Sequence, residues 1–92
     1  MNTEISDNAE QSRYEIRVDG DLAGFAEYER GEGAVVFTHT EVDSAFEGKG
    51  VGSALARGAL DDVRSKDLSV VPLCPFIKKW IDRHPDYHGL VR

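Results

Sequence analysis

Glu47-Gly48-Lys49-Gly50-Val51-Gly52 is the stretch of this sequence that decides the fold. Its glycines stand at alternate positions, which lets the chain bend tightly and bring successive backbone N–H groups to one point without Cβ atoms in the way. Apolar residues then recur at every fourth position, as they do on one face of a helix; they are Val51, Leu55, Ala59 and Val63. The pattern predicts a helix whose amino end binds a phosphate group.

Two interpretations of this glycine turn remain open. In the first, the backbone holds phosphate, and Lys49 and Ser53 add a cation and a hydroxyl at the same place. In the second, the glycines only permit a tight turn from a strand to a helix. A Walker A loop is excluded, because no glycine is followed by Lys-Ser or Lys-Thr at the required spacing.

Three strands are predicted before the glycine turn. Residues 13–18 alternate between apolar and polar, as in a half-buried strand. Residues 22–29 and 34–42 follow after short glycine-containing turns, so the three strands form an antiparallel meander. Residues 1–12 are polar and mostly acidic, and we expect a disordered tail there, followed by a single domain over 13–92.

The chain after the predicted helix indicates one more strand and one more helix. Residues 68–71 are short, apolar and β-branched, as expected of a buried strand that runs parallel to 34–42 after a right-handed crossover. Pro75 suits the first turn of a second helix, and Pro85 ends it. The predicted fold class is therefore α+β, with the order βββαβα in one mixed sheet.

Composition limits the function. The chain has 92 residues and a net charge of -6, so one domain is expected, with neither nucleic acid nor an anionic membrane as its partner. A run of about 20 apolar residues and a secretory leader are both lacking, which favours the cytoplasm. We expect a monomer or a weak homodimer. No metal site is predicted, because His84 and His88 do not belong to a cluster with ligand spacing.

The glycine turn resembles the acetyl-CoA signature of the GNAT superfamily of N-acyltransferases, which reads Arg/Gln-x-x-Gly-x-Gly/Ala. Gly50 and Gly52 match this signature, and Glu47 stands where Arg or Gln is usual. The resemblance implies that acetyl-CoA is the cofactor and that successive backbone amides hold its pyrophosphate. Those amides belong to Gly48, Lys49, Gly50, Val51, Gly52 and Ser53.

The second half of the chain carries a further resemblance. Pro72-Leu73-Cys74-Pro75-Phe76-Ile77 and Arg83-His84-Pro85-Asp86-Tyr87 are similar to segments of very short GNAT-like proteins with a Cys-Pro-Phe segment. Together the two resemblances cover most of residues 14–90. They lead us to predict Val42 and Phe76 as further cofactor-binding residues. Full-length GNAT enzymes have helices between their first two strands, where this chain has only Asp19-Gly20-Asp21.

Cys74 is the first catalytic candidate. If Pro75 is the first helical residue, Cys74 occupies the N-cap, where free amides and the helix dipole favour a thiolate. Such a group could accept an acetyl group before passing it to an amine. The alternative is a small buried side chain, which is how most single cysteines behave.

His39 is the general-base candidate, with Glu41 on the same face of its strand two residues later. The alternative is a half-exposed histidine without a catalytic role. Tyr87 is either an acid that protonates a leaving thiolate or, by preference, a packed aromatic side chain. Lys78 and Lys79 form a solvated helix face, from which either could meet the 3′-phosphate of CoA.

The sequence thus predicts an acetyl-CoA-dependent N-acetyltransferase whose acceptor is an unidentified amine on a small molecule or a protein, with or without Cys74 as an acyl carrier. The alternative is a non-catalytic CoA- or acyl-CoA-binding module that acts with a partner. A third possibility is a structural interaction domain, which would have no affinity for CoA.

Overall fold

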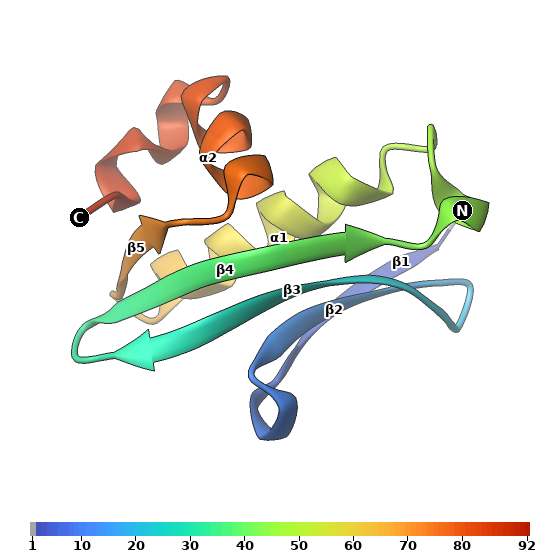
Figure 1. The fold of residues 1–92 in the computed structure, drawn as a ribbon, viewed down its shortest axis with the longest axis horizontal. Coiled ribbons are helices and arrows are strands. Elements are labelled where there is room, and N and C mark those ends of the chain that lie inside the picture. The colour runs from blue at the N-terminus through green and yellow to red at the C-terminus, as the bar shows by residue number, and fades with distance from the viewer. Residues whose placement is uncertain (1) are drawn as a thin grey trace.

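The structure is a computed structural model that describes residues 2–92 and consists of a five-stranded mixed sheet and helices (Figure 1). The strands are β1 (Thr3–Asn8), β2 (Arg13–Val18), β3 (Asp21–Gly31), β4 (Ala34–Val42) and β5 (Ser69–Pro72). The α-helices are α1 (Val51–Ser65) and α2 (Pro75–Asp82). Short 3-10 helices are η1 (Ala9–Gln11), η2 (Ser44–Phe46) and η3 (Pro85–Leu90).

The strands lie in the sheet in the same order as in the sequence. Strands β1 to β4 are antiparallel neighbours, and β5 pairs parallel to β4 after the chain has passed through α1. The predicted meander, βαβ unit and C-terminal helix are therefore confirmed, as is the α+β fold class. The strand predicted at 34–42 has the same bounds in the structure, whereas the strand predicted at 68–71 begins and ends one residue later.

The N-terminal residues correct one prediction. Residues 3–8 form β1, which pairs with β2 from Thr3↔Val18 to Asn8↔Arg13, so the expected disordered tail is wrong for them. Met1 lies outside the described residues. The strand is held through Ile5, whose side chain packs so closely on Gly58 of α1 that a Cβ added to this glycine would collide with it. One apolar side chain and a ladder of backbone hydrogen bonds are enough for an edge strand that is otherwise polar.

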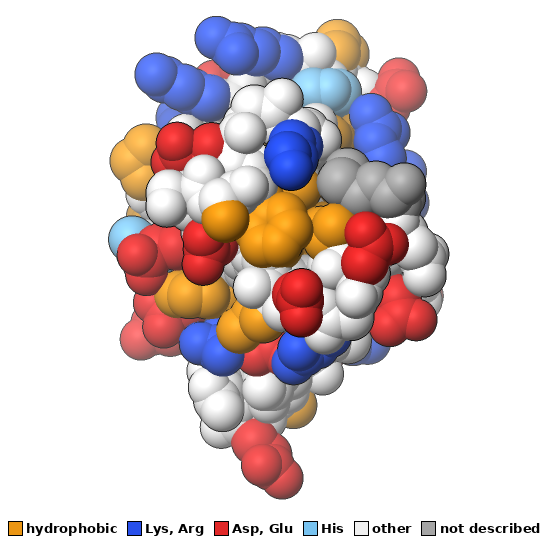
Figure 2. All heavy atoms as spheres, turned by 90° about the vertical axis from the view of Figure 1, so that its right-hand side faces the viewer, with side chains coloured by type: hydrophobic (Ala, Val, Ile, Leu, Met, Phe, Trp, Pro, Cys, Tyr) orange, Lys and Arg blue, Asp and Glu red, His pale blue; other side chains and the backbone are white. Residues whose placement is uncertain are grey.

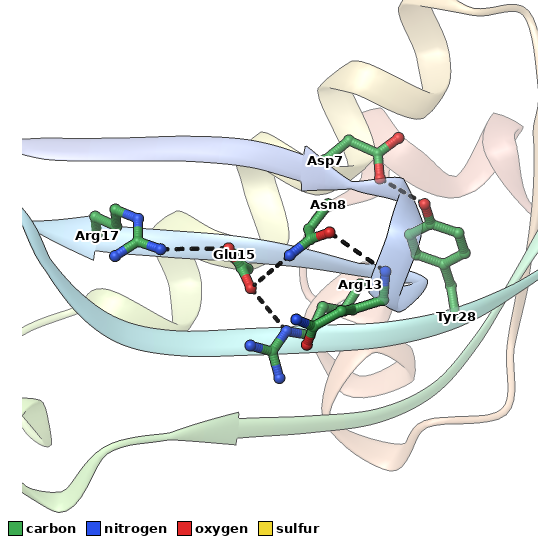
Figure 3. Close-up of polar contacts among 7 residues, drawn as sticks. Asp7, Asn8, Arg13, Glu15, Arg17 and Tyr28 are labelled. Atoms are coloured by element: carbon green, nitrogen blue, oxygen red, sulfur yellow. Dashed lines mark hydrogen bonds and ion pairs between the residues drawn. The ribbon is translucent and has the colours of Figure 1, made fainter.

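A buried carboxylate joins β1 to β2 (Figure 3). Glu15 has only 6% of its surface exposed, although the alternation in the sequence places it on a polar face. It accepts hydrogen bonds from Arg13 Nε at 2.8 Å and Asn8 Nδ2 at 3.1 Å, and Arg17 lies 3.6 Å away. Burial alone would raise the pKa of Glu15, but these donors outweigh it and hold the pKa below its usual value.

Helix α1 lies against the sheet with one apolar face. The side chains of this face are almost completely buried, and they are Val51, Leu55, Ala56, Ala59, Leu60 and Val63. They meet Phe37 of β4, which is fully buried at the centre of the core. Burying side chains of this size contributes about 1.5–3 kcal/mol each. The packing fixes the amino end of α1 beside the carboxyl end of β4 (Figure 1).

The carboxyl end of α1 is closed by a polar network. Tyr14 donates a hydrogen bond of 2.6 Å to Asp62, and Tyr28 donates to Asp7. Lys66 Nζ joins the two carboxylates, at 2.8 Å from Asp62 and 3.2 Å from Asp7. Burial, reinforced by the acceptor carboxylates, raises the pKa of Tyr14 above its usual range and that of Tyr28 to about 12. This network ties β1, β2 and β3 to the helix.

Candidate functional site

The glycine turn has the backbone conformation that the sequence indicated. Gly48 and Gly50 have φ angles of 78° and 75°, in the left-handed region that other residues rarely adopt. Gly50 is the N-cap of α1, and the helix begins at Val51. Apart from the glycine itself and its two chain neighbours, no atom of residues 2–92 would lie within 4 Å of a Cβ added at either position. The backbone angles, rather than crowding, therefore require glycine, and the space in front of the turn is open.

The turn presents a run of free backbone donors. Phe46 and Glu47 donate to carbonyls of the preceding 3-10 turn, and Ala54 is the first residue of α1 to donate into the helix, to Gly50 at 3.0 Å. Between them, the amides of residues 48–53 donate no hydrogen bond of ordinary geometry within the described part of the chain. Free amides at the positive end of a 15-residue helix favour an anion, and above all a phosphate.

A cavity of about 400 Å³ lies next to these amides, between the start of α1 and α2. Its lining residues are Gly52, Ser53, Phe76, Lys79, Trp80, Arg83 and His84. Lys79 and Arg83 bring positive charge to a chain whose net charge is -6. The predicted residue Phe76 is 42% exposed, and its ring lies 3.0 Å from the position that a Cβ at Gly52 would occupy. The volume is within the range of small-ligand sites.

Sequence reasoning missed Trp80, Arg83 and His84 as lining residues. Trp80 Nε1 donates to Ser53 Oγ at 2.8 Å, so the indole holds the serine at the start of α1. The rings of Trp80 and His84 stack with their centroids 3.8 Å apart, and His84 Nδ1 lies 2.6 Å from the Trp80 carbonyl oxygen. Trp80 and His84 follow Phe76 by four and eight residues, and this spacing could have indicated that the three side chains share one face of the chain.

The two lysines of α2 differ. Lys78 forms an exposed ion pair of 3.3 Å with Asp82, one turn later on the same helix. Lys79 lines the cavity instead. Of the two candidates for a phosphate contact, Lys79 is the one that the fold places at the site.

Strand β4 has a free edge beside this cavity. Its pairing with β5 ends at Phe37↔Pro72, after which the Cys74 amide donates to the Phe37 carbonyl at 2.9 Å and the chain leaves into α2. From His39 to Val42, β4 pairs with β3 on one side, and no strand of residues 2–92 pairs with it on the other. The edge reaches the glycine turn, because Val42 Cγ2 lies 3.5 Å from the Cβ position of Gly52.

A bulge in β4 decides which of its side chains face the helix side of the sheet. The register with β3 passes from Tyr28↔Phe37 to Glu27↔His39, which makes Thr38 an extra residue. Side chains beyond a bulge exchange faces relative to those before it. Phe37 is in the core on the helix side of the sheet, so Thr40 is turned toward that side and His39 toward the other.

The catalytic candidates accordingly fall into two groups. Cys74 is the N-cap of α2, as predicted, but it is only 3% exposed, and its Sγ lies 3.3 Å from Thr40 Oγ1. His39 and Glu41 are on the opposite face, with Nε2 and Oε2 3.3 Å apart and side chains 55% and 60% exposed. The structure thus brings His39 to Glu41 and Cys74 to Thr40, and β4 separates the two pairs. Thr40 was not a candidate, although it alternates with His39 along the strand.

Tyr87 is a packed aromatic side chain in this structure. Its hydroxyl donates to Asp61 at 2.8 Å and accepts from Arg57 at 3.2 Å, and its ring meets Trp80 edge-on. Burial and the Asp61 carboxylate raise the pKa of Tyr87. Among residues 2–92, no group of three or more His, Cys, Asp or Glu side chains is arranged to hold a metal ion, and no helix is long and apolar enough to cross a bilayer.

The fold combines a mixed sheet, in which the fourth and fifth strands separate, with a glycine-rich turn at the start of the helix that joins these strands. This combination defines a GNAT-like domain. Residues 13–90 match the family described as GCN5-related N-acetyl-transferase, and the chain belongs to this family. The assignment of a short GNAT-superfamily protein is thereby confirmed.

Curated relatives and solved structures agree with this assignment. Protein NATD1 of Mus musculus is 30% identical over 83 residues, which are 88% of this chain and 76% of that protein. The solution structure of a GCN5-like putative N-acetyltransferase from Staphylococcus aureus superimposes with a TM-score of 0.73 at 20% identity and covers 97% of this chain and 87% of that one. A ribosomal-protein-alanine N-acetyltransferase from Brucella melitensis has a TM-score of 0.57 at 24% identity, over 87% and 60% of the two chains.

Proposed function

We propose that this chain binds acetyl-CoA at the glycine turn and transfers the acetyl group to an amine. The observation that supports this most strongly is the run of free amides at residues 48–53, which lies beside a cavity with two cations and beside the free edge of β4. Membership of an N-acetyltransferase family supports the same conclusion.

Each part of the site suits one part of the cofactor. The amides of Gly48 through Ser53 would hold the pyrophosphate, and Lys79 and Arg83 would neutralise phosphate charge in the cavity. Phe76 would cover apolar parts of the ligand. The free backbone of β4 near Val42 would bind the amide-containing arm, as a further strand does, and would polarise the acyl carbonyl.

Acetyl-CoA supplies an acetyl group as a thioester. In direct transfer, His39 takes a proton from the acceptor ammonium, and Glu41, at 3.3 Å, stabilises the charged imidazole. The amine nitrogen then forms a bond to the acyl carbon as the carbon–sulfur bond breaks, and CoA leaves as a thiolate that takes up a proton. Every proton and electron pair is accounted for by the amine, His39 and the leaving sulfur.

Transfer through Cys74 is the second route. Its thiol would attack the acyl carbon and release CoA, and the amine would then displace the thiol in a second step. Thr40 Oγ1 lies 3.3 Å from the thiol and would relay its proton to the departing CoA sulfur, so the first step balances. Intact-mass measurement after addition of acetyl-CoA distinguishes the routes: a one-acetyl adduct that disappears in Cys74→Ala supports the second, and its absence during turnover supports the first.

The cofactor site is tested by calorimetry with two matched glycine variants. Gly50 and Gly20 both have positive φ, of 75° and 90°, and at both a Cβ would meet open space. Alanine therefore imposes a similar backbone strain of about 1–2 kcal/mol at each. We expect Gly50→Ala to bind acetyl-CoA at least about tenfold more weakly and Gly20→Ala, in the turn between β2 and β3, to bind it normally. Equal affinities in the two variants would reject the site.

One observation favours a non-catalytic CoA-binding module instead. Strands β2 and β3 are joined by Asp19 and Gly20 alone, so within residues 2–92 no helix covers the acceptor side there. Such a module would bind acetyl-CoA as tightly as the enzyme does but would give no acetylated product with any amine. Mass spectrometry of an amine panel, read beside the calorimetry, separates the two functions.

A further inference from the structure

A small hollow lies at the carboxyl end of β4 and is separate from the cavity between the helices. Its volume is about 210 Å³, and its lining residues are Leu22, Gly24, Phe25, Glu41, Val42 and Asp43. Val42 connects it to the glycine turn, because Val42 Cγ2 lies 3.4 Å from the Cβ position of Gly24 and 3.5 Å from that of Gly52. A ligand in this hollow would therefore be separated from the predicted cofactor loop by the Val42 side chain.

The hollow combines a closely packed floor with apolar walls. At Gly24, β3 and β4 approach so closely that an added Cβ would lie 2.7 Å from the Glu41 carbonyl oxygen. Leu22 is partly exposed, and the Phe25 ring has its centroid 6.5 Å from that of His39. An apolar stem with a ring or a short chain could therefore lie on Leu22 and Phe25 with its end near His39.

The charge of the hollow favours a cation. Its lining carries the carboxylates of Glu41 and Asp43, and none of its described lining residues is Lys or Arg. Asp43 Oδ1 accepts from the Ala45 amide at 2.9 Å, and Glu41 faces His39. Figure 2 views this end of the molecule, where apolar side chains lie among acidic and basic ones.

One cation does lie near Phe25. The Arg13 guanidinium is 4.6 Å from the centroid of the Phe25 ring, but its Nε is bound to the buried Glu15 at 2.8 Å. Its charge is thus compensated on β2, and it does not belong to the lining of the hollow.

We propose that this hollow binds the acceptor, and that the acceptor is a primary ammonium on a short apolar stem. The ammonium lies between the carboxylates of Glu41 and Asp43, and the stem packs on Leu22 and Phe25. The volume equals that of about seven water molecules, so it encloses a small amine or the end of one. This inference rests on the proposed acetyl transfer: His39, bound to Glu41, is the base for the ammonium, and the cofactor reaches the acceptor along the free edge of β4.

The test is a chemical-shift titration of the ¹⁵N-labelled chain with phenethylamine at neutral pH. The neutral 2-phenylethanol and the anionic 3-phenylpropionate have the same apolar stem and serve as matched probes. We expect saturable shifts with the amine alone, centred on the amides of Gly24, Phe25, Val42 and Asp43. Equal responses to the alcohol, or no saturable response to the amine, would overturn the proposal.

Two variants and a control test which side chains bind the ammonium group. Glu41→Gln and Asp43→Asn each remove one charge, and the asparagine keeps the oxygen that accepts from Ala45. Each should weaken phenethylamine binding by about fivefold. Glu32→Gln, in the turn at the other end of β4, should change nothing. Unchanged affinity in both pocket variants would overturn the assignment.

The outcome is independent of the cofactor, since amine binding needs no turnover. Acetyl-CoA affinity without saturable amine binding would reject this inference and leave the proposed cofactor site intact. Amine binding without acetyl-CoA affinity would reject the proposed function instead, and with it the role of acceptor.

Discussion

The two ends of α1 are built in opposite ways. At the amino end, the amides of residues 48–53 donate no hydrogen bond of ordinary geometry within residues 2–92, and Gly48 and Gly50 keep side chains away from them. At the carboxyl end, Lys66 donates its amide to the carbonyls of Asp62 and Val63, and its Nζ joins Asp62 of the helix to Asp7 of β1. Both ends are packed on the fold, but only the carboxyl end has its polar groups bonded within residues 2–92, which leaves the backbone donors of the amino end available to the proposed ligand.

Among the substitutions that test this difference, one that fills the space at the amino end of α1 should have the largest effect. Gly52→Val puts a side chain where Phe76 Cζ is already 3.0 Å from the Cβ position, and so crowds the amides at residues 48–53. We expect at least about a tenfold loss of acetyl-CoA affinity by calorimetry, with stability reduced by about 1 kcal/mol. The double variant Gly52→Val/Phe76→Ala should relieve the crowding without restoring affinity. Recovery of normal binding would show that Phe76, not the amides, was the part affected.

At the carboxyl end of α1, we expect a substitution to lower the stability of the fold rather than its affinity for the ligand. Asp62→Ala leaves the Tyr14 hydroxyl without its acceptor, and we expect unfolding to become easier by about 1–2 kcal/mol in urea, since Asp62 is partly exposed. Acetyl-CoA affinity should not change. Asp82→Ala is the control, because it breaks only the exposed pair with Lys78 and should cost less than about 0.5 kcal/mol. Equal losses of unfolding free energy in the two variants would mean that the network contributes no more to stability than an exposed ion pair does.

The tyrosines predict how this end responds to alkali. The pKa values of Tyr14, Tyr28 and Tyr87 are all raised from 10.0, chiefly by burial, and that of Tyr28 to about 12. A raised folded pKa contributes stability that is complete below the unfolded value and is lost as pH rises through the folded value. Phenolate absorbance should therefore appear together with unfolding, above pH 10.0. A reversible titration of all three phenols at their ordinary pKa, with the fold intact, would contradict the burial.

The smallest effect is expected from Lys66→Gln. Lys66 Nζ lies 2.8 Å from Asp62 and 3.2 Å from Asp7, but the lysine side chain is 41% exposed, so solvent screens both pairs. We expect a loss of less than about 1 kcal/mol that shrinks further in high salt. A larger loss, independent of salt, would mean that the lysine acts through packing.

Local patterns allowed much of the fold to be predicted. The bounds of β4, the start of α1 at the glycine turn and the N-cap position of Cys74 follow from β-branched residues, glycines and Pro75, all of which act over a few residues. Strand β1 was missed because its stability depends on distant partners. Ile5 packs on Gly58, and nothing near Ile5 in the sequence indicates that contact.

The candidate site, too, could be predicted only in part from local sequence patterns. The glycine turn was recognisable from its sequence, whereas the separation of Cys74 from His39 depends on a one-residue bulge at Thr38 that the alternation did not reveal. The bulge also turns Thr40 toward Cys74. No role was predicted for Trp80, since a large apolar side chain on a helix gives no sign that its indole nitrogen holds Ser53.

The most direct test of the account is a titration of the ¹⁵N-labelled chain with acetyl-CoA, followed at the amides of both ends of α1. We expect saturable downfield shifts at residues 48–53, where free donors would gain phosphate acceptors, and none at Lys66 and Asp67, whose amides are already bonded. Saturable binding that leaves residues 48–53 unperturbed, or no binding at all, would contradict the claim that the open end of α1 is the cofactor site.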